Sequence, residues 1–250
     1  MKTKWDYTEL AKAYLKRPDY SSEAIEHMLS VIGIKAGDTA CDVGAGVAHL
    51  TLKLANKDIY IDAVEPNDEM RKYGKIRTKD FSNVKWFEGT GEATGRADNT
   101  YDLVTFGSSF NVTDRTVAMR ETARIAKQNG WFCIMWNHRD LDDPIQLEIE
   151  NIIKDNIEEY SYGSRREDQS NIIDGSNLFH EVKKIEGSVI HNQTISDVVE
   201  AWRSHGTLHR QARSKFVKII SSIEQMLINT KKESIQIPYT TNIWYAQLKK

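Results

Sequence analysis

Short apolar runs alternate with helical segments along the first half of the chain, and this alternation constrains the fold more than any other feature. Strands are predicted at Thr39–Val43, Tyr60–Val64, Val84–Glu88, Tyr101–Phe106 and Trp131–Trp136. Helices are predicted between them at Ala48–Asn56, Asp68–Ile76 and Thr113–Ala126. Strands and helices that alternate at this spacing form right-handed βαβ units, so we expect an α/β protein with a parallel sheet and helices on both faces.

The second half of the chain has a different pattern. Isoleucines recur three or four residues apart from Ile145 to Ile157, as on one face of a long helix. A strand is predicted at Glu181–Gln193, helices at Ser196–Ser204 and Ala212–Leu227, and a last strand at Ile237–Leu248. A further helix, Tyr7–Arg17, is predicted to end at Pro18. Neither repeats nor a long linker divide the chain, so we expect a single domain, 1–250.

Composition limits the kinds of binding partner and the cellular compartment that we expect for this chain. The net charge is −2, which disfavours a nucleic-acid partner and gives no attraction to an anionic membrane. The first residues lack the apolar core of a signal peptide, and no apolar run is long enough to span a bilayer. Cys41 and Cys133 lie in apolar runs as buried free thiols would, so we expect the reducing cytoplasm. There is no Cys/His cluster with zinc spacing and no P-loop.

The stretch "CDVGAGVAHL", residues 41–50, contains the first candidate site. Gly44 and Gly46 follow a predicted strand, where the chain can turn tightly and bring its backbone close to a ligand. Glu65 ends the next strand, 19 residues after Gly46, where a carboxylate typically accepts the two hydroxyls of a ribose. A dinucleotide site would need a third glycine where His49 stands, and Asp42 suits a cationic ligand better than a pyrophosphate. A plain turn is the other alternative.

Three stretches in the right order and spacing resemble one family. "DVGAGVAHLTLKLA" is similar to the first motif of class I S-adenosylmethionine-dependent methyltransferases, "IDAVEPNDEM" to the second, and "FEGTGEATGRADNTYDLVTFGSSFNVTD" to the third and fourth. The resemblance covers roughly residues 36–140. Ala48 stands where the third family glycine usually is, and Thr90 replaces an acid that often touches adenine. The resemblance implies a Rossmann-like, seven-stranded, mostly parallel sheet with an antiparallel last strand and a helical lid insert.

The resemblance also implies roles for individual residues around the cofactor. Glu65 would hold the ribose hydroxyls, and Pro66, Asn67 and Met70 would lie around the ribose and adenine, although core packing would also explain Met70. The other implied cofactor-binding residues are Tyr14 and Tyr20 at the carboxylate or over the pocket, Asp42, Gly44, Ala45 and Gly46 at the methionine moiety, Thr90, Gly91 and Glu92 at the adenine, and Phe106, Gly107 and Ser108 near the sulfonium.

The methyl acceptor is constrained by the fourth motif, "TFGSSFNVTD". It lacks the D/N-P-P-Y signature of methyltransferases that act on amides and base amino groups. It most resembles the small-molecule branch, including trans-aconitate-type enzymes, in which a histidine often stands where this chain has Asn111. His138 in "WNHRD" is the candidate general base, or else a capping or solvated histidine, and Arg139 could pair with an acidic substrate or with Asp142. The acid that a catechol-type metal site needs is absent, so no metal is expected.

The lid is expected to come from residues 141–215. Residues 1–30 would cover the cofactor, 36–140 form the cofactor-binding core, and 216–250 supply the last helix and strand. "GSRRED", "WRSH" and "LHRQAR" distribute arginines and histidines through the lid. They would bind an anionic acceptor, or they form a solvated charged face.

The sequence therefore predicts a cytoplasmic monomer or homodimer that transfers a methyl group to oxygen or nitrogen of a small molecule. The cofactor would be S-adenosylmethionine and its product S-adenosylhomocysteine. A tRNA or protein methyltransferase, an NAD-dependent oxidoreductase and a non-catalytic binding protein are the alternatives.

Overall fold

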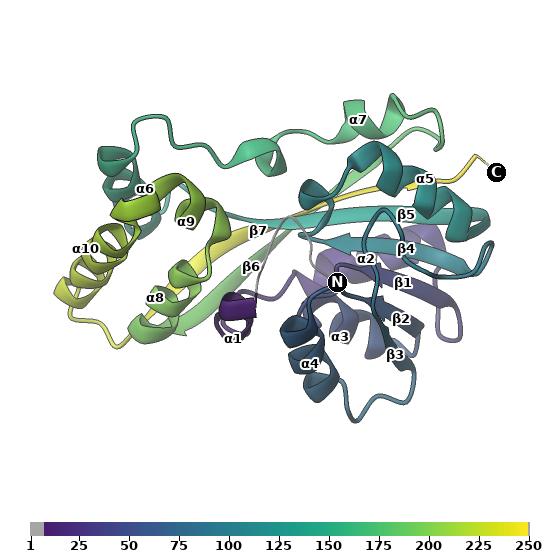
Figure 1. Ribbon diagram of the computed structural model, residues 1–250, viewed down its shortest axis with the longest axis horizontal. Helices are drawn as coiled ribbons and strands as arrows, with labels where there is room; N and C mark the ends of the chain where they lie inside the picture. Colours follow the sequence, from purple (N-terminus) through teal and green to yellow (C-terminus); the bar gives the residue numbers. More distant parts are fainter. Residues whose placement is uncertain (1–7, 250) are drawn as a thin grey trace.

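The computed structural model describes residues 8–249, and these residues form a sheet of seven strands (Figure 1). Across the sheet the strands lie in the order β3-β2-β1-β4-β5-β7-β6. Their bounds are β1 Thr39–Val43, β2 Tyr60–Val64, β3 Val84–Phe87, β4 Tyr101–Gly107, β5 Ala126–Arg139, β6 Lys183–Thr194 and β7 Ser234–Gln247. Strands β1 to β5 are parallel, whereas β7 is antiparallel to both β5 and β6. The predicted Rossmann-like sheet with an antiparallel last strand is confirmed.

The strand order creates a crevice at one edge of the sheet. The chain leaves β1 toward β2 and β3 and then returns to the other side of β1 with β4. The loops that follow β1 and β4 therefore separate at the carboxyl ends of these strands, which is where open α/β sheets bind ligands.

Helices cover both faces of the sheet, as predicted. Met28 of α2 and Leu54 of α3 pack in one apolar cluster with Leu103 of β4. The next residue of β4, Val104, packs in a second cluster with Ala118 of α5, because successive side chains of a strand point to opposite faces. The helices are α1 Ala11–Tyr14, α2 Ser22–Ile32, α3 His49–Ala55, α4 Asp68–Arg77, α5 Arg115–Ile125, α6 Pro144–Asn156, α7 Ser170–Asp174, α8 Ile195–Arg203, α9 Gly206–Ala212 and α10 Phe216–Asn229, with short 3₁₀ turns η1 Thr8–Leu10, η2 Phe110–Val112, η3 Gly163–Arg166 and η4 Arg213–Lys215.

The three longest strands, β5, β6 and β7, reach beyond the rest of the sheet and carry a separate group of helices. Figure 1 shows α6, α8, α9 and α10 around their far ends, at the left of the view. These helices share a third apolar cluster with β7, which includes Ile149, Ile153, Val198, Trp202, Ile223, Leu227, Ile235 and Ile237. We call α6, α8, α9 and α10 the lid helices. Helix α10, which the sequence grouped with the last strand, packs with them.

Helices α2, α7 and most of α9 were not predicted, and one predicted helix began too early. Ser21 caps α2 by accepting a hydrogen bond from the Ala24 N–H (3.3 Å), and Gly33 ends it at φ +74°. The predicted helix Ala212–Leu227 corresponds to α10, Phe216–Asn229; its first residue is the last residue of α9, and the 3₁₀ turn η4 lies between the two helices. The helix predicted from Tyr7 begins outside the described residues, and its described part is η1 and α1, which ends at Tyr14. Within the described residues, no helix is both long and apolar enough to cross a membrane.

Candidate functional site

A cavity of about 760 Å³ lies at the carboxyl ends of β1, β2, β4 and β5, between the sheet and the lid helices. Every residue that the sequence assigned to cofactor binding or catalysis lines this cavity, with the exception of Asp42. The volume falls within the range of ligand pockets, roughly 300–1,000 Å³. The topology of the sheet and the motif residues thus point to the same place.

The glycine turn after β1 forms one wall of the cavity. The N–H groups of Gly44 and Ala45 donate to the Val64 carbonyl at 2.8 and 3.1 Å. Gly44 has φ +69°, and a Cβ atom there would lie 2.4 Å from Cβ of Ser109. Only glycine satisfies both the left-handed backbone and the close approach of the β4 loop.

Asp42 supports this turn from within the protein and does not line the cavity. Its carboxylate accepts hydrogen bonds from the hydroxyls of Thr51 (2.6 Å) and Thr105 (3.1 Å), so it ties β1 to α3 and β4. Burial raises the pKa of Asp42 to about 6, and these hydroxyls offset part of the effect. The contact with a methionine moiety that the resemblance implied for Asp42 is not a direct one in this geometry.

Glu65 is a buried acidic residue in the cavity wall beside the glycine turn. One carboxylate oxygen accepts the Gly46 N–H and the other accepts the Asn67 N–H, both at 2.9 Å. The residue is only 7% exposed, and burial raises the pKa of its carboxyl to about 7. A carboxylate offers about four lone-pair positions, so acceptor capacity for two hydroxyl groups is left at the cavity.

The loops after β2 and β3 line the same cavity. Asn67 caps α4 by accepting the Met70 N–H at 3.0 Å. Met70 lines the cavity and also packs against Ala11 and Val47, so it serves the core as well as the site. The Glu92 carboxylate accepts the Asp114 N–H at 2.7 Å, which joins the loop after β3 to the start of α5.

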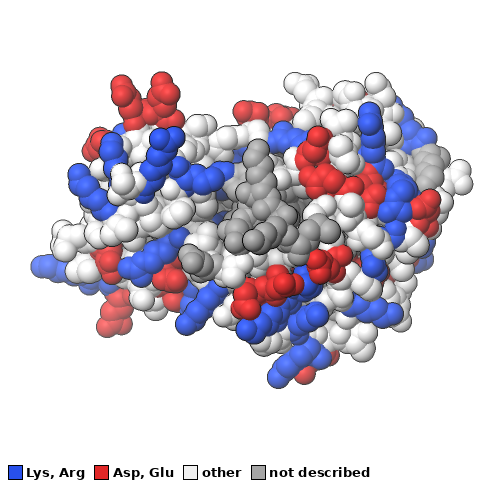
Figure 2. All heavy atoms as spheres, viewed as in Figure 1, with Lys and Arg blue, Asp and Glu red and all other residues white. Residues whose placement is uncertain are grey.

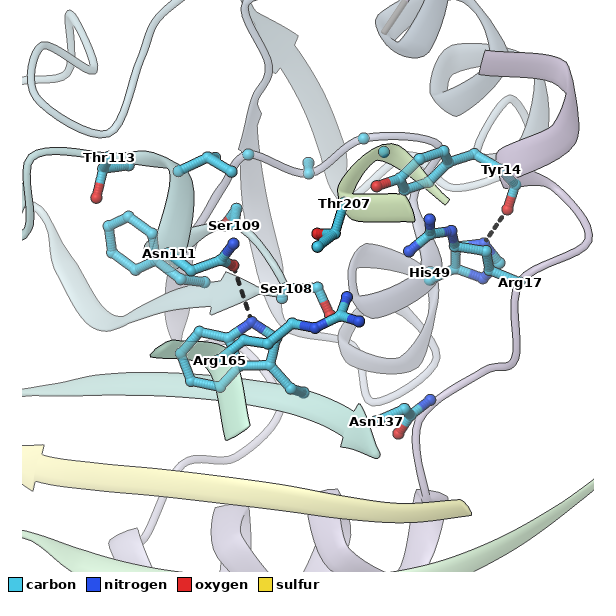
Figure 3. Close-up of a pocket in the computed structure, with 18 of the residues that line it drawn as sticks. Tyr14, Arg17, His49, Ser108, Ser109, Asn111, Thr113, Asn137, Arg165 and Thr207 are labelled. Carbon is cyan, nitrogen blue, oxygen red and sulfur yellow. Dashed lines mark hydrogen bonds between the residues drawn. The ribbon is translucent and has the colours of Figure 1, made fainter. Parts of the chain in front are cut away.

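The end of β4 carries an unusual backbone conformation. Ser108 has φ +58°, a left-handed value that is uncommon outside glycine, and its N–H donates to the Met135 carbonyl at 2.8 Å. Its hydroxyl lies 2.9 Å from the hydroxyl of Tyr20. Backbone strain of this kind concentrates at functional sites, and here it turns Ser108 toward the cavity (Figure 3).

Asn111 and Trp136 also line the cavity and contact each other. The indole N–H of Trp136 donates to the side-chain oxygen of Asn111 at 3.0 Å (Figure 3). Because an indole can only donate, this contact fixes the orientation of the amide. The amide nitrogen, which has no hydrogen-bond partner among the described residues, is then a donor for a bound molecule.

The candidate base His138 is held on both ring nitrogens. Nε2 lies 2.9 Å from the Arg165 carbonyl, and Nδ1 lies 3.2 Å from the side-chain nitrogen of Asn242. Nε2 must therefore carry the proton, and Nδ1 accepts. Burial, together with the charge of Arg166, lowers the pKa of His138 to about 4. In this geometry His138 could take a proton from an acceptor only by giving up its bond to Asn242.

The segment between α1 and α2 connects the sheet to the lid helices. Arg17 donates to the Ser204 carbonyl at 2.8 Å, and Lys16 pairs with Asp197 at 3.0 Å, both on the lid side. On the core side, His49 contacts the Tyr14 carbonyl at 3.0 Å (Figure 3) and the carboxylate of Asp19 at 2.8 Å. His49, which was a mismatch in a dinucleotide motif, holds this segment over the cavity.

Sequence reasoning missed several cavity residues that come from distant elements. Tyr162 precedes η3, and Tyr239 lies on β7 opposite Arg139. No local motif marks either of them, because each reaches the cavity through strand register or packing of the lid helices. His205, the histidine of "WRSH", precedes α9 and also lines the cavity. The described residues contain no cluster of His, Cys, Asp or Glu arranged to hold a metal ion.

Comparisons with known sequences agree with this site. Residues 41–134 match a family described as "Methyltransferase domain". An uncharacterized methyltransferase of Schizosaccharomyces pombe is 31% identical over 138 residues, which is 55% of this chain and 54% of that protein. A ubiquinone/menaquinone biosynthesis C-methyltransferase of Klebsiella pneumoniae is 28% identical over 120 residues, 45% of this chain and 48% of that protein. The chain thus spans about half the length of these relatives.

Solved structures share the fold at low sequence identity. The YcgJ protein of Bacillus subtilis superposes with a TM-score of 0.58 at 17% identity, over 92% of this chain and all of that one. A phosphoethanolamine N-methyltransferase 2 of Haemonchus contortus, solved with phosphomonomethylethanolamine and S-adenosylhomocysteine, has a TM-score of 0.57 at 13% identity, over 99% of this chain and 58% of that one. Together with the family match, these structures support the class I methyltransferase fold.

Proposed function

We propose that this protein is a class I S-adenosylmethionine-dependent methyltransferase that acts on oxygen or nitrogen of a small molecule. The observation that carries the proposal is the pair formed by the glycine turn and Glu65. The turn brings backbone to the cavity wall, and Glu65, held by the Gly46 and Asn67 N–H groups, keeps acceptor capacity for a ribose. The match of residues 41–134 to a methyltransferase domain supports the same assignment.

The residues of the cavity divide into a cofactor side and an acceptor side. On the cofactor side, Glu65 would hold the ribose hydroxyls, the Gly44–Gly46 turn the amino-acid end, and Gly91 and Glu92 the adenine edge. S-adenosylmethionine supplies, when bound, a methyl group on a cationic sulfur. Ser108 and Asn111 lie where the two sides meet, so they would orient the acceptor atom.

Positioning is the main contribution of this site to the reaction. Methyl transfer is an in-line displacement, so holding the reactants in line and excluding water supplies much of the rate. Each cavity-lining histidine of the described residues, His49, His138 and His205, is already hydrogen-bonded within the protein. An acceptor atom that needs no strong base, such as a neutral amine or an ionised oxygen, fits this arrangement.

A small acceptor fits the site better than a macromolecule. Helices α8 and α9 and the segment through Arg17 line the acceptor side, and Arg17 and Lys16 join this segment to the lid through Ser204 and Asp197. On the face drawn in Figure 2, Lys and Arg side chains lie among Asp and Glu side chains over the coloured parts, without the basic stripe that binds RNA. We therefore place the chain in the small-molecule branch that "GSSFNVTD" resembles, trans-aconitate-type enzymes included.

The organisation and compartment follow the same proposal. We propose one domain in which residues 36–140 bind the cofactor and residues 141–215 contribute most of the acceptor side. Cys41 and Cys133 are buried and unpaired, which supports the cytoplasm.

Calorimetry with S-adenosylhomocysteine and with NAD, side by side, tests the function. We expect S-adenosylhomocysteine to bind, and binding to be lost in Glu65→Ala. Since Glu65 also holds the glycine turn, Glu65→Gln, which keeps one acceptor oxygen, should fold and bind more weakly. Glu148→Ala, an exposed residue of α6, is the matched control and should bind as the wild type does. Binding of NAD alone would end the proposal in favour of an oxidoreductase.

A further inference from the structure

The charges that line the cavity are separated by sign. The acidic residues Glu65, Glu92 and Asp114 lie on the cofactor side, at the ends of β2 and β3 and the start of α5. The acceptor side carries arginines from four elements or their flanking loops: Arg17, Arg139, Arg165, Arg166 and Arg210. A cavity with this separation offers its acceptor side to an anion.

Four of these arginines have no acidic partner among the described side chains. Within residues 8–249, apart from the Glu9 side chain, which is not described, no carboxylate lies within salt-bridge distance of Arg17, Arg139, Arg165 or Arg166. The lack of an ion pair does not by itself set them apart: among the described residues the exposed Arg203 pairs with Glu200 and Glu224, but the exposed Arg120 and Arg213 have no ion pair. The difference is burial, because the four cavity arginines are partly buried in the cavity wall, where water solvates their charge less.

Aromatic rings hold two of the guanidinium groups in place without neutralising them. Arg139 lies 4.0 Å from the ring centre of Trp202, and Arg166 lies 4.4 Å from that of Tyr162. Stacking of this kind orients the guanidinium plane and leaves its edge N–H groups available.

The Arg165 guanidinium has a poor partner. Its Nη2 lies 2.9 Å from Nε2 of His205, while Nδ1 of the same ring lies 3.2 Å from the Leu208 N–H. The Arg165 guanidinium and the Leu208 N–H can only donate to the His205 ring, yet a neutral imidazole has only one acceptor nitrogen. Protonation does not resolve the conflict, because a charged imidazole accepts nothing. One of the two donors is therefore unsatisfied until another acceptor arrives.

Burial and like charges add to the cost of this arrangement. Burial, and after it the charges of Arg17 and Arg139, lowers the pKa of Arg165 to about 10. An anion beside Arg165 would reverse this effect, since opposite charge favours the cation. Figure 3 shows the Arg165 guanidinium directed into the cavity toward Ser108, where the cofactor and acceptor sides meet.

We propose that Arg165, with Arg17 and Arg139, forms an oxyanion site for the methyl acceptor, so that the acceptor carries a carboxylate or phosphate group. The claim that the bound anion is the methyl acceptor rests on the proposed function, but anion binding itself can be tested without methyl transfer. The oxyanion would accept hydrogen bonds from the Arg165 guanidinium. The single acceptor nitrogen of His205 would then be left for the Leu208 N–H. The rest of the acceptor would extend toward Ser108 and Asn111.

Titration calorimetry at constant ionic strength tests the site, with inorganic phosphate and citrate as separate probes. Each is titrated into the protein with and without S-adenosylhomocysteine. We expect at least one probe to bind, and its affinity to fall tenfold or more in Arg165→Gln, since a charge-assisted hydrogen bond is lost. Arg165→Lys, which keeps the charge but not the fork, should lie between. Arg120→Gln, on the exposed side of α5, should bind as the wild type does.

The outcomes separate the two proposals. Binding of citrate but not phosphate identifies a carboxylate acceptor, and the reverse identifies a phosphate acceptor. If neither probe binds the wild type, or if Arg165→Gln binds both unchanged, the oxyanion site is refuted. Should an anion bind while S-adenosylhomocysteine does not, the site stands and the methyltransferase assignment fails. S-adenosylhomocysteine affinity within about twofold of wild type in Arg165→Gln would show that the loss is confined to the acceptor side.

Discussion

Cofactor affinity should depend on pH through Glu65. Burial raises the pKa of this carboxyl to about 7 in the free protein. Accepting two ribose hydroxyls requires the ionised form, because a protonated carboxyl has lost acceptor capacity. Ribose hydroxyls therefore favour the carboxylate and lower its pKa in the complex. Below pH 7 the free protein must release a proton in order to bind, so affinity falls as the pH falls.

The size of the effect follows from linkage. With a free pKa of about 7 and a much lower bound value, the fraction of ionised Glu65 changes about tenfold between pH 8 and pH 6. The dissociation constant of S-adenosylhomocysteine should therefore rise about tenfold over that interval, which corresponds to about 1.4 kcal/mol. Calorimetry at half-unit pH steps measures it directly.

Two variants isolate the group responsible. Glu65→Gln should bind more weakly at every pH and show no such dependence between pH 6 and 8. Asp42 has a pKa near 6 and its charge contributes to the raised pKa of Glu65, so Asp42→Asn should keep the pH dependence but shift it to lower pH. A flat wild-type profile, or an unchanged slope in Glu65→Gln, would refute the assignment of Glu65 to the ribose.

Three further substitutions test the turn, the helix start and the base. In a denaturant titration, Gly44→Ala should lower the free energy of unfolding by about 2 kcal/mol or more, because its Cβ would meet Ser109 at 2.4 Å. Gly95 also has a positive φ but has nothing within 4 Å of an added Cβ, so Gly95→Ala should lower this free energy less. Ala48→Gly should raise that free energy by roughly 0.5–1 kcal/mol, since Ala48 has φ +74° and glycine removes the left-handed strain at a smaller entropic cost. His138→Gln should reduce kcat less than tenfold once an acceptor is found, because the ring is held at both nitrogens; a hundredfold loss with unchanged cofactor binding would instead establish His138 as the general base.

The part of the site that sequence could predict is the part built from local chain. The Gly44–Gly46 turn and Glu65 lie at the ends of consecutive strands, so strand periodicity and spacing alone bring them to one edge of the sheet. Asp42 shows the limit of that reasoning. Its neighbour across the sheet is Thr105, 63 residues further along the chain, and this partner turns its carboxylate into the protein.

The acceptor side could not be predicted in the same way. Arg165 meets His205 across 40 residues, and Arg139 faces Tyr239 only through the register of β5 and β7. Charge along the sequence showed arginines in the lid region but not which of them would face the cavity. By contrast, the missed helix α2 had readable signals in its Ser21 cap and in Gly33.

The central claim is that this cavity transfers a methyl group to a small molecule. It is tested most directly by incubating the protein with methyl-labelled S-adenosylmethionine and a fractionated extract of small cellular metabolites, followed by mass spectrometry. We expect a small product that carries the label and has gained one methylene unit in mass, formed by the wild type and not by Glu65→Ala. Label that appears only in RNA or protein, or in no product although S-adenosylhomocysteine binds, would contradict the claim.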